Sequence, residues 1–142
     1  MSPSLETAER FARALDAENY TAAAALLGPG CEYTCRGTRY HGPAEIIETY
    51  RQSGESVQRE FDAATYESRC ERLTQREALI HFLDRLTKSG QTFTFACQQL
   101  VEVDNSGQIV RIEHQDLPGQ REALTEFKRK VDSMKEAMPS RK

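Results

Sequence analysis

The first 27 residues have the hydrophobic period of two helices. A first helix is expected over residues 2–18, because its apolar side chains return on one face. These side chains are Ala8, Phe11, Ala12 and Leu15. Asn19 can cap a second, alanine-rich helix that runs to Leu27. Gly28-Pro29-Gly30 then ends it, since proline cannot continue a helix and glycine accepts the turn.

Two later segments have the same helical period. Gly42-Pro43 opens a third helix, and Ser53-Gly54 is expected to close it. Its apolar stripe consists of Ile46, Ile47 and Tyr50. A fourth helix follows Pro118-Gly119 and is stopped by Pro139. Its stripe consists of Leu124, Phe127, Val131 and Met134.

The rest of the sequence alternates with a period of two, which is typical of strands. A strand over residues 31–40 turns at Gly37. Its side chains Cys31, Tyr33 and Cys35 share one face. Four long strands are then expected, over residues 57–73, 76–86, 91–103 and 108–116. Polar turns between the later strands make them antiparallel hairpins. The chain, residues 1–142, is therefore expected to be one α+β domain.

Composition and charge exclude several classes of function. The net charge of -3 and the sequence pI near 5.7 give no basic surface for nucleic acid. No apolar run reaches the length of a membrane span, and the N-terminus lacks the features of a signal peptide. We expect a cytoplasmic protein with neither a membrane nor a nucleic acid as partner.

The cysteines and histidines lack the spacing of a metal site. The four cysteines, at positions 31, 35, 70 and 97, form no CxxC pair, and no two histidines lie near two of them. His41 falls in a loop, and His81 lies on the outer side of its strand. We therefore expect reduced thiols, no metal and no cofactor.

Polar residues interrupt the apolar inner side of two neighbouring strands. In the third long strand the odd-numbered positions are apolar except for Gln99, so Gln99 points inward. In the fourth, Val110 and Ile112 mark the inner face, and His114 and Asp116 share it. Buried polar groups cost about 1–3 kcal/mol each unless they are paired. This cluster therefore needs mutual hydrogen bonds, water or a ligand.

Each of these residues also has a structural explanation. Hairpin pairing sets His114 beside either Cys97 or Gln99, and an inward histidine bonded to a glutamine or a carbonyl needs no ligand. Asp116 can cap the turn before the last helix. Cys35 and Cys97 fit as small buried hydrophobic residues, and Cys97 with His114 is the only pair that could supply a nucleophile and its base.

The order of these elements, with three local motifs, resembles the nuclear transport factor 2-like superfamily, in particular its SnoaL-like branch. The motifs are FARALDAEN at 11–19, CEYTCRGTRYHGPAEIIETY at 31–50 and GQIVRIEHQD at 107–116. The resemblance covers nearly the whole chain. It implies a cone-shaped half barrel, in which a curved antiparallel sheet and three helices of the N-terminal half enclose a pocket, with a C-terminal helix in addition.

The resemblance also implies partners. The pocket would hold a small hydrophobic or polar-headed molecule, and the outer face of the sheet would pair two subunits. Leu79, Leu83 and Leu100 lie on that outward parity, which supports a homodimer. The second long strand is apolar on both sides, and the resemblance favours the parity that turns Asp84 inward. The expected lining residues are Phe11, Tyr33, Cys35, Tyr50, Phe82, Phe95, Cys97, Gln99 and Ile112.

The catalytic residues of the superfamily carry over only in part. Ketosteroid isomerases use a tyrosine and two aspartates, and the matching positions hold Phe11, Cys35 and Gln99. Steroid isomerisation is disfavoured, because no carboxylate stands where the proton moves. Tyr50 matches a supporting tyrosine of that group.

Two other branches offer partial matches. SnoaL-like cyclases use an inner-wall histidine and aspartate, which His114 and Asp116 match in type. Limonene epoxide hydrolases use an Asp-Arg-Asp set, whose composition Asp84, Arg85 and Glu113 imitate. Adjacent residues face opposite ways on a strand, so Asp84 and Arg85 would not converge.

Three hypotheses follow. The first is an isomerase, cyclase or lyase in which His114 is the acid or base, Asp116 or Asp84 tunes it, and Gln99 holds a carbonyl oxygen. The second is a binding module without chemistry, and the third is an association domain with a vestigial pocket. A roomy pocket on which His114 and a carboxylate converge favours the first, and a small dry pocket favours the third.

Overall fold

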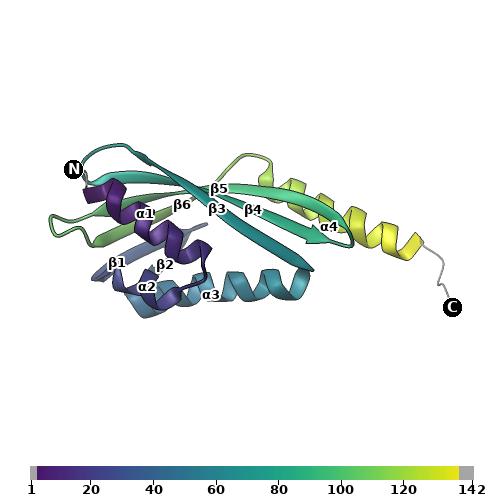
Figure 1. Ribbon diagram of the computed structural model, residues 1–142, viewed down its shortest axis with the longest axis horizontal. Coiled ribbons are helices and arrows are strands. Elements are labelled where there is room, and N and C mark those ends of the chain that lie inside the picture. Colours follow the sequence, from purple (N-terminus) through teal and green to yellow (C-terminus); the bar gives the residue numbers. More distant parts are fainter. Residues whose placement is uncertain (1–2, 138–142) are drawn as a thin grey trace.

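The computed structural model describes residues 3–137, which form a curved six-stranded sheet with helices packed against it (Figure 1). The helices are α1 (Pro3–Asp16), α2 (Tyr20–Ala25), α3 (Pro43–Glu60) and α4 (Gln120–Ala137). The strands are β1 (Leu27–Cys35), β2 (Thr38–His41), β3 (Ala63–Arg72), β4 (Glu77–Lys88), β5 (Gln91–Val103) and β6 (Ile109–Asp116). The predicted α+β class with a curved sheet is confirmed.

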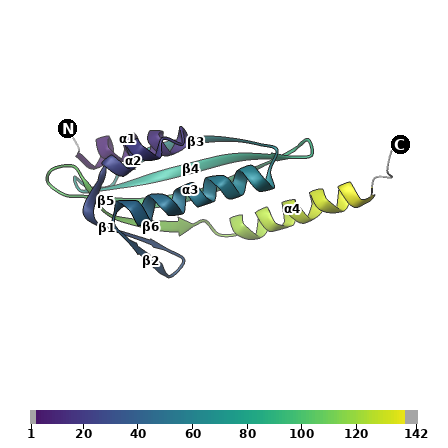
Figure 2. The same cartoon turned by 90° about the horizontal axis from the view of Figure 1, so that it is seen from below.

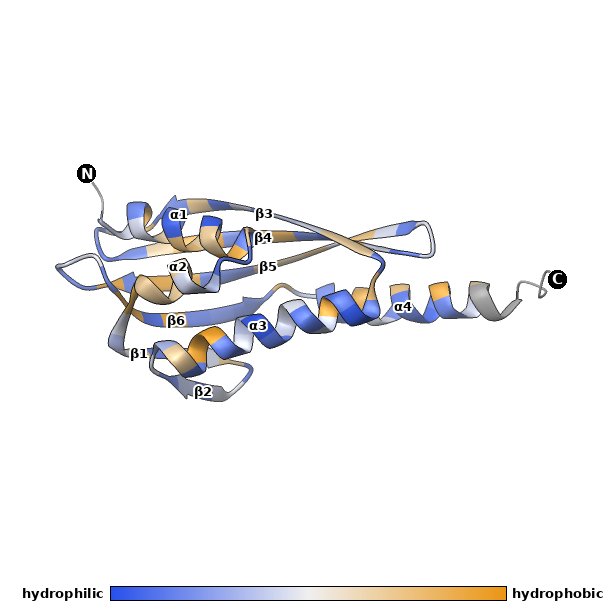
Figure 3. Cartoon of the chain, turned by 60° about the horizontal axis from the view of Figure 1, so that its bottom comes forward, coloured by the Kyte–Doolittle hydropathy of each residue, from blue (hydrophilic) through white to orange (hydrophobic). Residues whose placement is uncertain are grey.

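The strands lie in the order β2-β1-β6-β5-β4-β3, and only the β1–β6 pair among them is parallel. Helix α1 packs across β3, β4 and β5, while α3 packs on β1 and β2. Figure 2 shows α3 in front of the strands and α4 leading away from the end of β6. The polar residues of both helices alternate with apolar ones along each helix, as Figure 3 shows. One side of each helix can therefore face the sheet.

The hydrophobic core lies between α1, α3 and the inner face of the sheet. Its largest fully buried side chains include Phe11, Ile46, Ile80, Val101 and Ile112. In the sheet register Val101 faces Ile112, and the next inward pair along these two strands is Gln99 with His114. The apolar core therefore ends at the level of the polar cluster.

The segment Gly28-Pro29-Gly30 belongs to the first strand and does not end the second helix. Helix α2 stops at Ala25, because the carbonyl of Leu26 accepts a hydrogen bond from the Ile109 amide at 2.9 Å. Leu27 then pairs with Ile109, and the register shifts before the pairing resumes further along β1. Pro29 lies inside this shift, where no ladder hydrogen bond from its nitrogen is needed.

Helix α3 continues through Ser53-Gly54 to Glu60, so the expected strand from residue 57 starts only at Ala63. Gly54 has a packing role. A Cβ at this position would lie 2.8 Å from the Tyr20 hydroxyl oxygen, so the glycine allows close approach of α2 to α3.

Two smaller expectations were also wrong. A bulge in the β5–β6 ladder puts Ile109 opposite Val103, so Ile109 rather than Val110 is the fully buried residue there. Beyond the bulge, Ile112 and His114 face inward as predicted. Met134 does not continue the buried stripe of α4, since it is 51% exposed, whereas Val131 is buried. Pro139 lies outside the described residues.

Candidate ligand pocket

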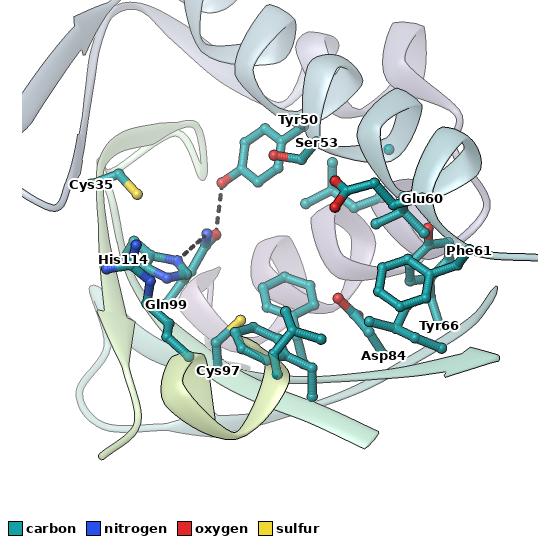
Figure 4. A pocket seen from close by; sticks show the side chains of 18 of the residues that line it. Cys35, Tyr50, Ser53, Glu60, Phe61, Tyr66, Asp84, Cys97, Gln99 and His114 are labelled. Carbon is teal, nitrogen blue, oxygen red and sulfur yellow. Dashed lines mark hydrogen bonds between the residues drawn. The ribbon is translucent and has the colours of Figure 1, made fainter. Parts of the chain in front are cut away.

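A cavity of about 940 Å³ lies between the inner face of the sheet, α3 and α4 (Figure 4). This volume is in the range of small-molecule sites. Nine of the residues predicted from the sequence line it: Tyr33, Cys35, Tyr50, Phe82, Asp84, Phe95, Cys97, Gln99 and His114. The roomy pocket argues against a vestigial one.

Three predicted residues do not line the cavity. Phe11 and Ile112 are fully buried in the core, where other side chains separate them from the open space. Phe11 instead supports the wall, because its ring meets that of Tyr50 edge-on at 5.7 Å between centroids. Asp116 lies at the end of its strand and is drawn away by an ion pair with Arg36.

One wall of the cavity is a hydrogen-bonded cluster centred on Gln99, which is only 3% exposed. The Tyr50 hydroxyl donates to Gln99 Oε1 at 2.7 Å. Gln99 Nε2 donates to the Tyr33 hydroxyl at 3.3 Å and lies 3.1 Å from His114 Nδ1. The sheet register explains this contact, since Gln99 and His114 are directly opposite each other on β5 and β6.

The cluster extends to an ion pair at the end of the sheet. His114 Nε2 lies 2.9 Å from Asp116 Oδ1, and Arg36 binds both carboxylate oxygens of Asp116 at 2.7 and 2.8 Å. Arg36, with Gly37, forms the β1–β2 turn, and both residues have positive φ as such tight hairpin turns require. Arg36 first, and His114 next, lower the pKa of Asp116 to about 2.

The partners fix the direction of every hydrogen bond in this chain of groups. A carboxylate only accepts, so His114 Nε2 carries the proton that faces Asp116, and Nδ1 accepts from the Gln99 amide. Both imidazole nitrogens, and both amide hydrogens of Gln99, are therefore used within the protein. In this arrangement neither side chain has a free donor for a ligand, which argues for a structural role of the cluster.

Asp84 occupies the opposite side of the cavity, as Figure 4 shows. Its cross-strand neighbours are Tyr66 on β3 and Phe95 on β5. Within residues 3–137 no group donates a hydrogen bond to its carboxylate. Burial, and then the nearby charge of Asp16, raise the pKa of Asp84 to about 6. A carboxyl group in this state can take up or release a proton near neutral pH.

Tyr66 is a pocket residue that the sequence reasoning missed. Burial, and then the charge of Asp84, raise its pKa to about 12, so the hydroxyl keeps its proton. No partner for that hydroxyl is found in the described part of the chain. The signal was present in the period-two pattern of β3, where alternate residues such as Tyr66, Ser68 and Cys70 are partly buried. Tyr66 is thus a free hydrogen-bond donor beside Asp84.

Helix α4 forms the outer wall of the cavity and was not assigned a role from the sequence. Strand β6 ends opposite Cys97, which leaves the edge of β5 unpaired beyond that point. Gln120 Oε1 accepts from the Ala96 amide at 2.9 Å on this freed edge, and Phe127 stacks near Phe93 at 5.4 Å. Both contacts hold α4 against the cavity.

The two pocket cysteines are not arranged as nucleophiles. Burial raises the pKa of Cys97 to about 12, which keeps the thiol protonated. Cys97 lies opposite Asp116, while His114 lies opposite Gln99, so no imidazole is paired with the Cys97 sulfur. Arg36 Nη1 donates to the Cys35 sulfur at 3.7 Å.

The Asp-Arg-Asp composition does not converge in the pocket. Asp84 lines the cavity, whereas Arg85 points outward and pairs with Glu67. Glu113 also lies on the outer face, 3.7 Å from Arg111. Residues 3–137 contain no group of three or more histidine, cysteine or acidic side chains that could hold a metal ion. No helix among them is long and apolar enough to cross a membrane.

No protein-family profile matches the sequence, and no curated protein matches it. Solved structures do match. The protein TerC, co-crystallised with polyporic acid, is 14% identical, with a TM-score of 0.68 and with 90% of this chain and 99% of TerC covered. An LEH-like epoxide hydrolase of Mycobacterium tuberculosis is 20% identical, with a TM-score of 0.62 and coverages of 87% and 90%.

A third structure carries the name of the fold. It is an NTF2-like protein of unknown function from Exiguobacterium sp. 255-15, 15% identical, with a TM-score of 0.57 and coverages of 79% and 98%. Identities this low establish the architecture and leave the activity open. The chain therefore has the fold of the nuclear transport factor 2-like superfamily, as the resemblance in its sequence predicts.

Proposed function

We propose that this protein binds a small, largely apolar molecule in the cavity and acts on it as an enzyme of the isomerase, cyclase or lyase kind found in the SnoaL-like branch. The observation that carries the proposal is Asp84, a partly buried carboxyl group that faces the cavity without a hydrogen-bond partner among residues 3–137. Such groups are costly to keep, and they are concentrated at functional sites.

The roles of the pocket residues follow from which groups are free. Asp84 takes the proton from the bound molecule, since its pKa of about 6 leaves it largely ionised at neutral pH. Tyr66 donates a hydrogen bond to the substrate oxygen that gains charge, because it is the cross-strand neighbour of Asp84 and its hydroxyl has no protein acceptor among the described residues. Gln99 and His114 hold the facing wall rigid. This assignment moves the proton-transfer role from His114 to Asp84.

A non-catalytic binding module is the alternative, and proton exchange separates the two. β-Tetralone is a neutral fused-ring ketone with acidic C–H bonds, and its loss of deuterium can be followed by NMR. We expect the protein to accelerate this exchange and Asp84→Asn to reduce the acceleration by about 100-fold or more. Asp62→Asn, a change outside the cavity lining, is the control. Binding of the ketone with no acceleration of exchange would leave only the binding module.

We also propose a homodimer through the outer face of the sheet. Leu79 and Leu100 are directly opposite each other on β4 and β5, and they stay partly exposed in the single chain, as does Leu83. Light scattering at micromolar concentration should give twice the chain mass of 16.1 kDa. Leu100→Glu should shift the protein to monomer, because a carboxylate cannot be buried there unpaired. A wild-type protein that stays monomeric would rule the dimer out.

A further inference from the structure

The charges around the cavity are unbalanced. Six acidic side chains line it, Asp16, Glu18, Glu60, Asp84, Glu122 and Glu126, against three basic ones, Arg36, Arg121 and Lys128. Ion pairs remove two basic and two acidic groups from this balance, since Arg36 binds Asp116, Lys128 lies 2.8 Å from Glu60, and Glu126 is paired with Arg129. Asp16, Glu18, Asp84 and Glu122 then stand against Arg121. The uncompensated charge facing a bound molecule is therefore negative, which disfavours an anion and favours a cation.

Hydrogen-bond capacity on the Gln99 wall points the same way. The hydrogens of Tyr50, Gln99 and His114 are directed at protein acceptors. Among Tyr50, Gln99 and His114, a ligand carboxylate or phenolate would find no free donor, and the Tyr33 hydroxyl hydrogen is the donor left on this wall. The Tyr50 hydroxyl oxygen and Gln99 Oε1 keep lone pairs that can accept a hydrogen bond, so this wall suits ligand groups that donate one.

The other side of the cavity combines a carboxylate with aromatic rings. Tyr66 and Phe95 flank Asp84 on the neighbouring strands, and Phe82 lies on the same face of β4, two residues away. All four line the cavity. Ring faces attract a cation, and a partly buried carboxylate pairs with it more strongly than it would in water. A carboxylate surrounded by aromatic rings therefore suits a ligand with an ammonium group attached to an apolar ring system.

We propose that the pocket selects amines, and that the molecule it takes is an apolar ring system whose protonated nitrogen lies between Asp84 and the rings of Tyr66, Phe82 and Phe95. This inference rests on the proposed use of the cavity as a ligand site. One Asp84 oxygen can hold the ammonium group while the other stays open to a proton. The compound co-crystallised with TerC is an acid by name, so a preference for amines would be a different choice of ligand class.

Three probes of the same shape test the inference by isothermal calorimetry at neutral pH. They are naphthylmethylamine, which is cationic, naphthylmethanol, which is neutral, and naphthoate, which is anionic. We expect the amine to bind at least about tenfold more tightly than the alcohol, and the carboxylate at least about tenfold more weakly. In Asp84→Asn the preference for amine over alcohol should fall to about one, while Asp62→Asn should keep it.

The outcomes separate the two proposals. Equal affinities for amine and alcohol in the wild-type protein, or tighter binding of naphthoate, would overturn the selection of amines and leave the ligand cavity standing. An amine preference that survives Asp84→Asn would overturn the assigned position of the nitrogen. Absence of binding by all three probes, with no exchange of β-tetralone, would overturn the ligand cavity itself.

Discussion

Replacing Gln99 by leucine is expected to destabilise the protein by about 3 kcal/mol, although leucine is apolar and similar in size. The change removes the acceptor of the Tyr50 hydroxyl and the donor to His114 Nδ1. Both groups would then be left unpaired in a buried position, and each such loss costs about 1–3 kcal/mol. Urea unfolding measured by circular dichroism should show the difference as a lower midpoint with an unchanged slope.

Gln91→Leu is the matched control, because Gln91 lies on the same strand but is exposed at its start. It should change the unfolding free energy by less than about 0.5 kcal/mol. A Gln99→Leu protein as stable as the wild type would mean that the wall cluster is not structural. Gln99 and His114 would then return as ligand-binding groups, kept at a cost in stability.

Asp84→Asn is expected to stabilise the protein by about 2–3 kcal/mol at about pH 8, the opposite direction from Gln99→Leu. The pKa of Asp84 is raised from its usual 3.8 to about 6 in the folded protein. The folded state therefore binds the proton more tightly than the unfolded chain does. The stability linked to this proton is complete below 3.8 and is lost as the pH rises to about 6.

The gain from Asp84→Asn should accordingly shrink as the pH falls. Above about pH 7 the wild-type protein holds an ionised, unpartnered carboxylate, which asparagine replaces with a neutral amide of the same shape. Near pH 4 the folded wild type is protonated at Asp84, and the two proteins should unfold at similar midpoints. A gain independent of pH, or a loss of stability at pH 8, would contradict the assigned state of Asp84. If Asp84→Asn is more stable than the wild type but no longer accelerates proton exchange, the ionised carboxylate is kept for function at a cost in stability.

Alternation along two strands was sufficient to predict much of the inner wall. Gln99 and His114 were placed inward because each breaks an otherwise apolar parity, and a strand has only two faces. The register between them could not be fixed from the sequence. A bulge near Val110 settles it in favour of Gln99 opposite His114.

The free groups of the pocket were harder to predict. Asp84 lies on a strand with apolar residues on both faces, so its direction depended on the family resemblance rather than on the pattern. Gly54 has the local pattern of a helix end, because a sequence does not show that Tyr20 approaches it. The wall built by α4 depends on where β6 stops, and hydrogen-bond directions around His114 depend on Asp116 and its ion pair. Each of these is a long-range contact that local pattern does not contain.

Titration of the Asp84 carboxyl carbon by NMR, with and without naphthylmethanol bound, tests whether Asp84 is an unpaired carboxylate that faces a ligand site. We expect a midpoint near the folded pKa of about 6 in the free protein, which moves when the neutral probe fills the cavity and removes water from the carboxylate. The pKa of Asp116, which is held by Arg36, should stay at about 2 in both titrations. An Asp84 midpoint near the usual 3.8 that no bound compound changes would contradict a partly buried, unpaired carboxylate facing a ligand.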